Sequence, residues 1–189
     1  MAQKKRIKSP LVTLNGIDNK PAKEVFEEEL AESGKSLNKA QQKVLAAFNT
    51  YQEIPDTRGT DFTSKGMALI EKMVFKKNRK TAQAFLYYGA QTTPELFRNT
   101  KTGSTVTVPV SLTLYANPVE AQKHTSANGF VLIVQEAIAI PVASEDNPDA
   151  LTYVIGPDAN LKIEKIDRIT WANGSFISKG VSVFTTVMQ

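Results

Sequence analysis

The residue types that most often perform chemistry are scarce in this chain. Its 189 residues include no cysteine and a single histidine, His124. The lack of cysteine excludes a disulfide framework, a thiolate zinc site and a cysteine nucleophile, and one histidine cannot form a multi-histidine metal site. A general base needs an orienting partner and a nucleophile within reach. Thr125 and Ser126 follow His124 directly, which establishes neither, so we interpret His124 as a loop histidine exposed to solvent.

A second chemical pattern is Gly34-Lys35-Ser36, which matches the last residues of a phosphate-binding loop. The full pattern requires a glycine five residues before Gly34 and a buried strand before that glycine. Glu29 occupies this position, and its carboxylate would repel a phosphate. We therefore predict that Gly34 ends one helix and that Ser36 caps the next.

Acidic residues gather in the segments around 151–155, and oxygen ligands of this kind can hold a hard cation. The members are Glu145, Asp146, Asp149 and Asp158. Their spacing does not match a calcium loop of the EF-hand kind, which needs a central glycine and a distal glutamate. We interpret them as solvated loop residues and predict no metal and no cofactor.

Two basic clusters are the most informative features of the sequence. Their members, which we predict to bind a partner or nucleic acid, are Lys4, Lys5, Arg6 and Lys8 in the first and Lys76, Lys77, Arg79 and Lys80 in the second. Basic side chains release counterions from phosphates, and the aromatic residues Phe85, Tyr87 and Tyr88 could stack on unpaired bases. The alternatives are that the lysine-rich segment is the solvated end of a helix and that the aromatic residues belong to the core, which is more common for both patterns.

The net charge of +4 conceals a division along the chain. Residues 1–103 carry 18 basic and 11 acidic side chains, which gives +7, whereas residues 104–189 carry 5 and 8, which gives −3. Opposite charges on two parts of one chain favour head-to-tail contacts between copies.

The first part of the chain is predicted to be an arm followed by helices. Lys and Arg residues, Pro10 and Asn15-Gly16 are typical of an extended arm over residues 1–20. Pro21, the acidic residues after it and Gly34 predict a helix over 21–33. Apolar spacing predicts a helix over 36–53, and a third helix is expected to start after Thr63 or Ser64. Residues 81–88 are ambiguous between helix and strand.

The second part is predicted to be β-rich. Apolar and polar residues alternate over 105–114, and apolar runs follow over 130–142, 151–155 and 161–166. Asn173-Gly174 predicts a two-residue hairpin turn between 169–172 and 175–178.

Together these patterns predict an α+β protein with an N-terminal arm and two or three helices, followed by a mainly antiparallel β-sandwich or small barrel. The predicted division is an arm over 1–20, a helical segment over 21–103 and a β-rich core over 104–189; residues 21–189 could also form one domain.

The densest apolar stretch, residues 130–143, is interrupted by Gln135, Glu136 and Pro141 and is shorter than the roughly 20 residues that cross a membrane. No apolar segment of a signal peptide follows the basic N-terminus. We therefore expect no membrane partner, and a location in the cytoplasm or within an assembled particle.

The function predicted from these features is that of a non-enzymatic structural or assembly protein. It would contact other copies of itself or other assembly subunits, as a virion-type component such as a shell, connector or tail protein does. One alternative is a single-strand nucleic-acid-binding protein that uses the basic segments 4–8 and 72–80. Another alternative is an enzyme that uses carboxylates with Mg²⁺, because such sites are assembled in space and leave little trace in a sequence.

Overall fold

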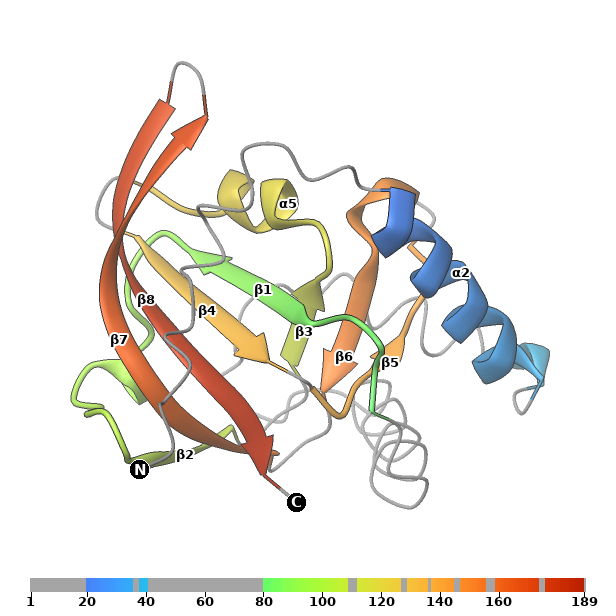
Figure 1. Ribbon diagram of the computed structural model, residues 1–189, viewed down its shortest axis with the longest axis horizontal. Coiled ribbons are helices and arrows are strands. Elements are labelled where there is room, and N and C mark those ends of the chain that lie inside the picture. The colour runs from blue at the N-terminus through green and yellow to red at the C-terminus, as the bar shows by residue number, and fades with distance from the viewer. Residues whose placement is uncertain are drawn as a thin grey trace, which may run out of the picture.

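The computed structural model describes residues 20–35, 38–40, 80–108, 112–126, 129–135, 137–144, 147–155, 159–173 and 176–188. Their dominant feature is a sheet of eight strands in the order β2-β7-β8-β4-β1-β3-β6-β5 (Figure 1). The neighbours pair antiparallel, except for the parallel pair β4 and β8. The strands are β1 (Phe85–Ala90), β2 (Thr105–Val108), β3 (Leu112–Tyr115), β4 (Phe130–Gln135), β5 (Ile140–Pro141), β6 (Thr152–Ile155), β7 (Ala159–Asn173) and β8 (Phe176–Met188).

The sheet is almost divided between β1 and β3. Strand β1 pairs with β4 along its whole length, from Phe85 opposite Gln135 to Ala90 opposite Phe130. In contrast, β1 pairs with β3 only where Tyr87 lies opposite Tyr115. We call this single pair the seam. One hydrophobic core joins the strands on both sides of it, and this core includes Val108 and Leu161 from one side and Leu112 and Tyr153 from the other.

Successive side chains of β1 serve opposite faces of the sheet, as strand geometry requires. Leu86 and Tyr88 belong to the main core. Tyr87 belongs to a smaller cluster on the opposite face, together with Tyr115 and Ala121. Both faces of β1 are therefore buried.

Helices cover the sheet at two places in the described residues. Helix α2 (Lys20–Gly34) packs near β5 and buries Phe26, whose ring meets Tyr153 edge to face with centroids 5.4 Å apart. Helix α5 (Pro118–Lys123) follows β3 and carries Ala121 into the smaller cluster. The 3-10 turns η1 (Glu95–Phe97) and η2 (Pro148–Ala150) complete the described elements.

The predicted fold is wrong. The described residues are mostly β-sheet, and their strands form one eight-stranded sheet that takes in β1, where a helical segment followed by a sandwich or small barrel was predicted. One error concerns β1, a central strand that lies within the predicted helical segment 21–103, where residues 81–88 were left open between helix and strand. Leu86, Tyr87 and Tyr88 are all buried, so the segment lacks the alternation of apolar and polar residues that is typical of a half-exposed strand. A short apolar run can form either a buried strand or a buried helix, and the sequence pattern alone does not distinguish the two.

Some local predictions are confirmed. The helix expected over 21–33 is α2, and Gly34 is its last residue. The hairpin expected at Asn173-Gly174 is also present, since β7 and β8 pair up to Asn173 opposite Phe176. Most of the predicted arm and of the second and third helices lies outside the described residues, so the division of the chain into three segments stays a prediction. Within the described part of the chain, no helix combines the length and the apolar character that crossing a membrane requires.

Candidate functional site

Two clusters of polar side chains lie on opposite faces of the sheet, and each contains a carboxylate and a tyrosine. The first, which we call the α5 centre, consists of Tyr115, Glu120, Lys123, His124 and Asn147. The second, which we call the α2 centre, consists of Glu29, Thr81, Gln83 and Tyr153.

The α5 centre is formed because the chain turns back over β3 directly after Tyr115. The side chain of Asn117 caps α5 by accepting a hydrogen bond of 3.1 Å from the amide of Val119, and Pro118 occupies the first turn. Asparagine at a cap followed by proline is a common start of a helix. The dipeptide Asn117-Pro118 is therefore a local sequence signal for the start of α5, although this helix was not predicted.

Helix α5 lies so close to β1 that only glycine fits beneath it. A Cβ atom added to Gly89 would lie 2.0 Å from the carbonyl oxygen of Ala121. Real Cβ atoms do not approach an oxygen so closely, so any larger residue would push α5 away from the sheet. Gly89 thus fixes the distance between α5 and the strands below it.

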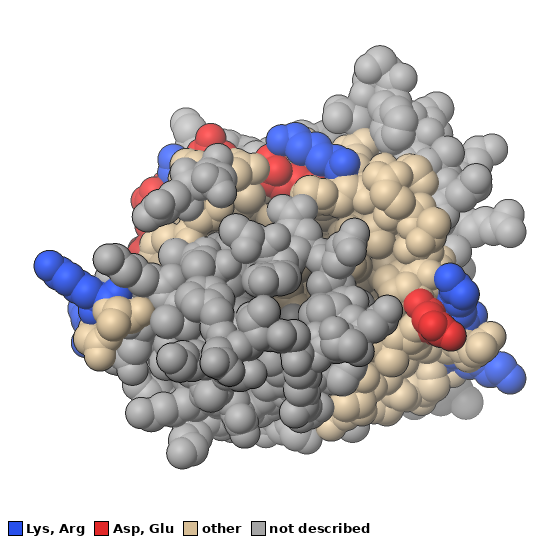
Figure 2. Space-filling model, turned by 180° about the vertical axis from the view of Figure 1, so that it is seen from behind, with Lys and Arg blue, Asp and Glu red and all other residues tan. Residues whose placement is uncertain are grey.

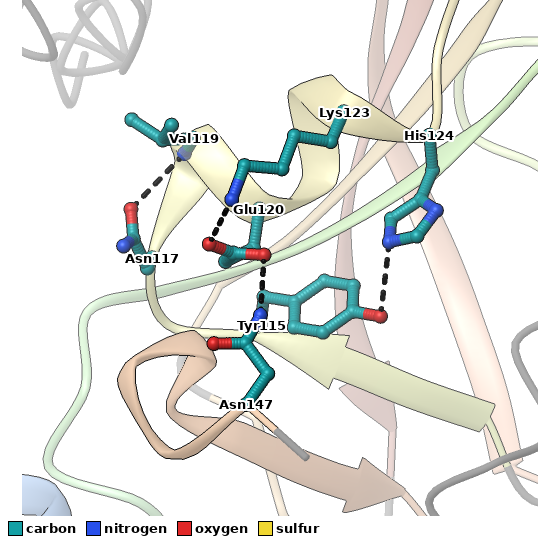
Figure 3. A network of polar contacts seen from close by, with 7 residues as sticks. All are labelled: Tyr115, Asn117, Val119, Glu120, Lys123, His124 and Asn147. Carbon is teal, nitrogen blue, oxygen red and sulfur yellow. Dashed lines mark hydrogen bonds and ion pairs between the residues drawn. The ribbon is translucent and has the colours of Figure 1, made fainter.

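The carboxylate of Glu120 is buried within this centre, with 9% of its side chain exposed. Its Oε1 atom accepts a hydrogen bond of 2.7 Å from Nζ of Lys123, and Oε2 accepts one of 2.9 Å from the side-chain amide of Asn147 (Figure 3). The Lys123 side chain is 60% exposed. These contacts offset the cost of burying the charge, and they connect α5 with the segment that leads into β6.

His124 ends α5 and stacks on Tyr115, with ring centroids 5.6 Å apart and planes inclined by 11°. Nε2 of the imidazole lies 3.3 Å from the Tyr115 hydroxyl oxygen. Burial lowers the pKa of His124; Glu120 opposes this effect and Lys123 adds to it. The imidazole is therefore mostly neutral near pH 7, as a general base must be.

Tyr115 keeps its proton under the same conditions. Burial, followed by the nearby Glu120 and Tyr88, raises the pKa of Tyr115 to about 12. Its hydroxyl can donate to Nε2 of His124 when the imidazole proton is on Nδ1. That tautomer directs the Nε2 lone pair at the tyrosine.

The α2 centre has a different character. The carboxylate of Glu29 accepts hydrogen bonds from the Thr81 hydroxyl at 2.8 Å, from the Ala82 amide at 2.6 Å and from the Tyr153 hydroxyl. Gln83 donates to the carbonyl of Ala22 at 2.8 Å. Burial, followed by the bond to Glu29, raises the pKa of Tyr153. Tyr153 is fully buried, so we assign this centre to the attachment of α2 to the sheet.

Of the basic residues predicted to bind a partner or nucleic acid, the structure describes only Lys80. Lys80 is exposed and forms an isolated bridge with Ile138, and the other predicted basic residues lie outside the described part. Figure 2 shows the described Lys and Arg side chains at separate points of one face, some of them beside Asp or Glu. The interpretation of His124 as a solvent-exposed loop residue is wrong, because the ring is half-buried on Tyr115.

The acidic segments do not form a metal site in the described residues. Asp149 is exposed in η2, and Glu145, Asp146 and Asp158 lie outside them. Among the residues described, no group of three His, Asp or Glu side chains could hold a metal ion.

No protein-family model matches the chain, and no curated protein matches it in sequence. Solved structures do match it. Plx2a, an ADP-ribosyltransferase toxin from Paenibacillus larvae, superposes with a TM-score of 0.61 at 15% identity, over 92% of this chain and 98% of that one. Vis toxin, an ADP-ribosyltransferase from Vibrio splendidus, does so with a TM-score of 0.58 at 14% identity, over 95% and 91%.

The fold is that of ADP-ribosyltransferases. Another match is exoenzyme S from Pseudomonas aeruginosa, solved in complex with human 14-3-3 protein beta and bound to Carba-NAD. It superposes with a TM-score of 0.54 at 12% identity, over 85% of this chain and 88% of that one.

These likenesses overturn the prediction of a non-enzymatic structural or assembly protein of virion type, together with its single-strand nucleic-acid alternative. The fold that spans nearly the whole chain is one found in enzymes. The prediction failed because the sequence offers few catalytic residue types, and contacts such as that of Glu120 with Asn147 form only in the folded chain.

Proposed function

We propose that this chain is an ADP-ribosyltransferase, which binds NAD and transfers its ADP-ribose unit to a nucleophilic side chain of a protein. The observation that supports this proposal is the likeness of fold over 92% of this chain and 98% of Plx2a. The occurrence of Carba-NAD in the exoenzyme S structure supports NAD as the donor. Fold alone hosts many functions, so the chemistry must be argued from side chains.

The transfer reaction makes specific demands. The bond between the nicotinamide nitrogen and C1′ of the adjoining ribose breaks, and its electron pair leaves with nicotinamide. The acceptor atom forms a new bond to C1′, and its proton passes to a base. Positive charge develops on the ribose as the bond breaks, so a nearby anion and a neutral base both lower the barrier.

The α5 centre contains groups suited to each demand. His124 is half-buried, and its lowered pKa keeps it neutral. In the tautomer with the proton on Nε2, Nε2 donates to the Tyr115 hydroxyl oxygen, and the lone pair of Nδ1 can accept the proton of the acceptor. The carboxylate of Glu120 provides negative charge beside the ring. The Lys123 ammonium, largely exposed, can pair with a phosphate oxygen of the dinucleotide. The α2 centre lacks such a base, and Tyr153 is inaccessible.

The test is an assay of nicotinamide release from NAD by the purified chain, with and without added acceptor protein. We expect release by the wild-type chain, and a loss of roughly a hundredfold or more in His124→Ala, because general-base catalysis contributes about that much. Lys35→Ala is the control, since Lys35 pairs with Glu32 on the exposed side of α2, far from the α5 centre in sequence. Calorimetric titration of NAD accompanies the assay.

Two results would contradict the proposal. If the wild-type chain neither binds NAD nor releases nicotinamide, the chain is not an ADP-ribosyltransferase. If it is active but His124→Ala retains full activity, the reaction takes place elsewhere in the chain.

A further inference from the structure

The position of His124 depends on a contact with the end of β1. Gln91 directly follows that strand, and its side-chain amide donates hydrogen bonds to the backbone carbonyls of His124, at 3.2 Å, and Thr125, at 3.3 Å. One amide group thus binds the two carbonyls at the end of α5, where backbone acceptors lack partners within the helix.

A third hydrogen bond runs in the opposite direction across the same junction. The hydroxyl of Ser126 donates to the backbone carbonyl of Gln91 at 2.9 Å. The turn beyond it is also tightly packed, because a Cβ atom at Gly129 would lie 2.6 Å from the carbonyl oxygen of Ala90. The backbone after His124 is therefore held against the end of β1 from both sides.

Among the residues that the structure describes, the imidazole makes one polar contact, with the Tyr115 hydroxyl. Its stacked position on Tyr115 therefore depends on the backbone that carries it. That backbone is fixed at Gly89, where α5 rests on β1, and at Gln91, where α5 ends.

We propose that Gln91 is a positioning residue for His124, which keeps the imidazole stacked on Tyr115 and directed into the α5 centre. Gln91 acts through the backbone and touches no reacting atom. Its effect on catalysis rests on the proposed function, whereas its effect on the placement of the ring does not.

The chain offers an unusually direct test, because His124 is its only histidine. The imidazole signals in an NMR spectrum therefore need no assignment by mutation. We compare the wild type with Gln91→Ala and with Gln91→Glu, which keeps the shape of the side chain but replaces the donating amide by an acceptor. The control is Arg98→Ala, which removes a side-chain hydrogen bond to a different backbone carbonyl, that of Thr93.

In both Gln91 variants we expect the nuclear Overhauser contacts between the His124 and Tyr115 rings to weaken severalfold or disappear. A ring released into solvent loses the effect of burial, so its titration midpoint moves upward. Gln91→Glu moves it further than Gln91→Ala, because a carboxylate favours the charged imidazole. The charged groups near the ring, Glu120 and Lys123, are the same in all variants. Arg98→Ala leaves the contacts and the midpoint unchanged.

In the transfer assay of the Gln91 variants, the acid limb of the plot of kcat against pH shifts to higher pH together with the titration midpoint of His124. The value of kcat at its optimum pH falls by roughly tenfold or more, because small misplacements of a catalytic group are costly. Unchanged ring contacts and an unchanged midpoint in both folded Gln91 variants would overturn the proposal. If the ring contacts change as expected but the wild-type chain has no transfer activity, the positioning role stands and the proposed function fails.

Discussion

The α2 and α5 centres combine the same residue types but are assigned different roles, the first in attaching a helix to the sheet and the second in the proposed reaction. Each contains a carboxylate and a tyrosine. Glu29 and Tyr153 are 124 residues apart in the sequence, whereas Tyr115 and Glu120 are close together in it. In the α2 centre, the carboxylate of Glu29 accepts bonds from a backbone amide and two hydroxyl groups, and Tyr153 is completely buried. In the α5 centre, Glu120 is bound by a largely exposed lysine and by Asn147, and a half-buried histidine stands beside the tyrosine.

The comparison shows what separates a structural contact from a candidate for catalysis. A carboxylate such as that of Glu29, whose hydrogen-bond donors are all fixed by the fold, can only connect secondary-structure elements, because a ligand that approached it would have to break one of those hydrogen bonds. A carboxylate whose cationic partner reaches into solvent can exchange that partner for a ligand. An adjacent imidazole, which can accept and release a proton, adds proton transfer.

The largest effect is expected from Gly89→Ala, which should destroy the α5 centre alone. The added methyl group would collide with the carbonyl of Ala121, so α5 must move. Overpacking of this kind costs about 3 kcal/mol of unfolding free energy. Urea denaturation measures the loss, and the transfer assay should show no activity in the fraction that remains folded. Full activity in Gly89→Ala would mean that the α5 centre does not carry the reaction.

The second-largest expected effect is a loss of stability when the carboxylate of the α2 centre is removed. Glu29→Ala removes the acceptor of three donors and leaves the Tyr153 hydroxyl buried with one fewer partner. We expect a loss of about 2 kcal/mol of unfolding free energy, as for hydrogen bonds to a charged group. Activity per folded molecule should stay at the wild-type level. A large loss of activity without loss of stability would reverse the roles assigned to the two centres.

A third, smaller effect is expected from Glu120→Gln. The amide keeps the shape of the side chain and its contact with Asn147, but it removes the negative charge next to His124. We expect unfolding free energy to change by about 1 kcal/mol and transfer to slow by roughly tenfold, since the developing positive charge loses its counterpart. Steady-state kinetics at saturating NAD measure this change. Equal rates in Glu120→Gln and the wild type would remove Glu120 from the mechanism.

The smallest effect is a pH dependence of stability. The pKa of His124 is lowered in the folded chain, so the unfolded chain binds the proton more readily. The contribution of His124 to stability is complete above the ordinary histidine pKa of about 6.5, and it is lost as the pH falls toward the lower folded value. Thermal unfolding between pH 7.5 and 5 should show this loss in the wild type and a smaller one in His124→Gln. Identical curves would show that the imidazole is not buried in solution.

The sequence predicted those elements whose signals are local. Helix α2 has its glycine at the end, and the hairpin of β7 and β8 has Asn173-Gly174 between its strands. The alternating residues 105–114 were expected to form one strand, but they contribute to β2 and β3, which pair with different neighbours on opposite sides of the seam. The alternation does not specify the partner of a strand.

The candidate site could not be predicted in the same way. His124 depends on Tyr115, nine residues earlier, and on Gln91, 33 residues earlier. Glu120 depends on Asn147, 27 residues later. These contacts arise because β1, β3 and the segment before β6 become neighbours in the sheet, and neither spacing nor composition records that arrangement.

The seam has a thermodynamic consequence of its own. Because β1 and β3 share a single residue pair, the two sides of the sheet are joined mainly by apolar side chains and not by a ladder of backbone hydrogen bonds. Hydrophobic packing weakens on cooling. We therefore expect the junction at Tyr87 and Tyr115 to loosen on cooling before the strands on either side of it, an order that amide hydrogen exchange at low temperature would measure.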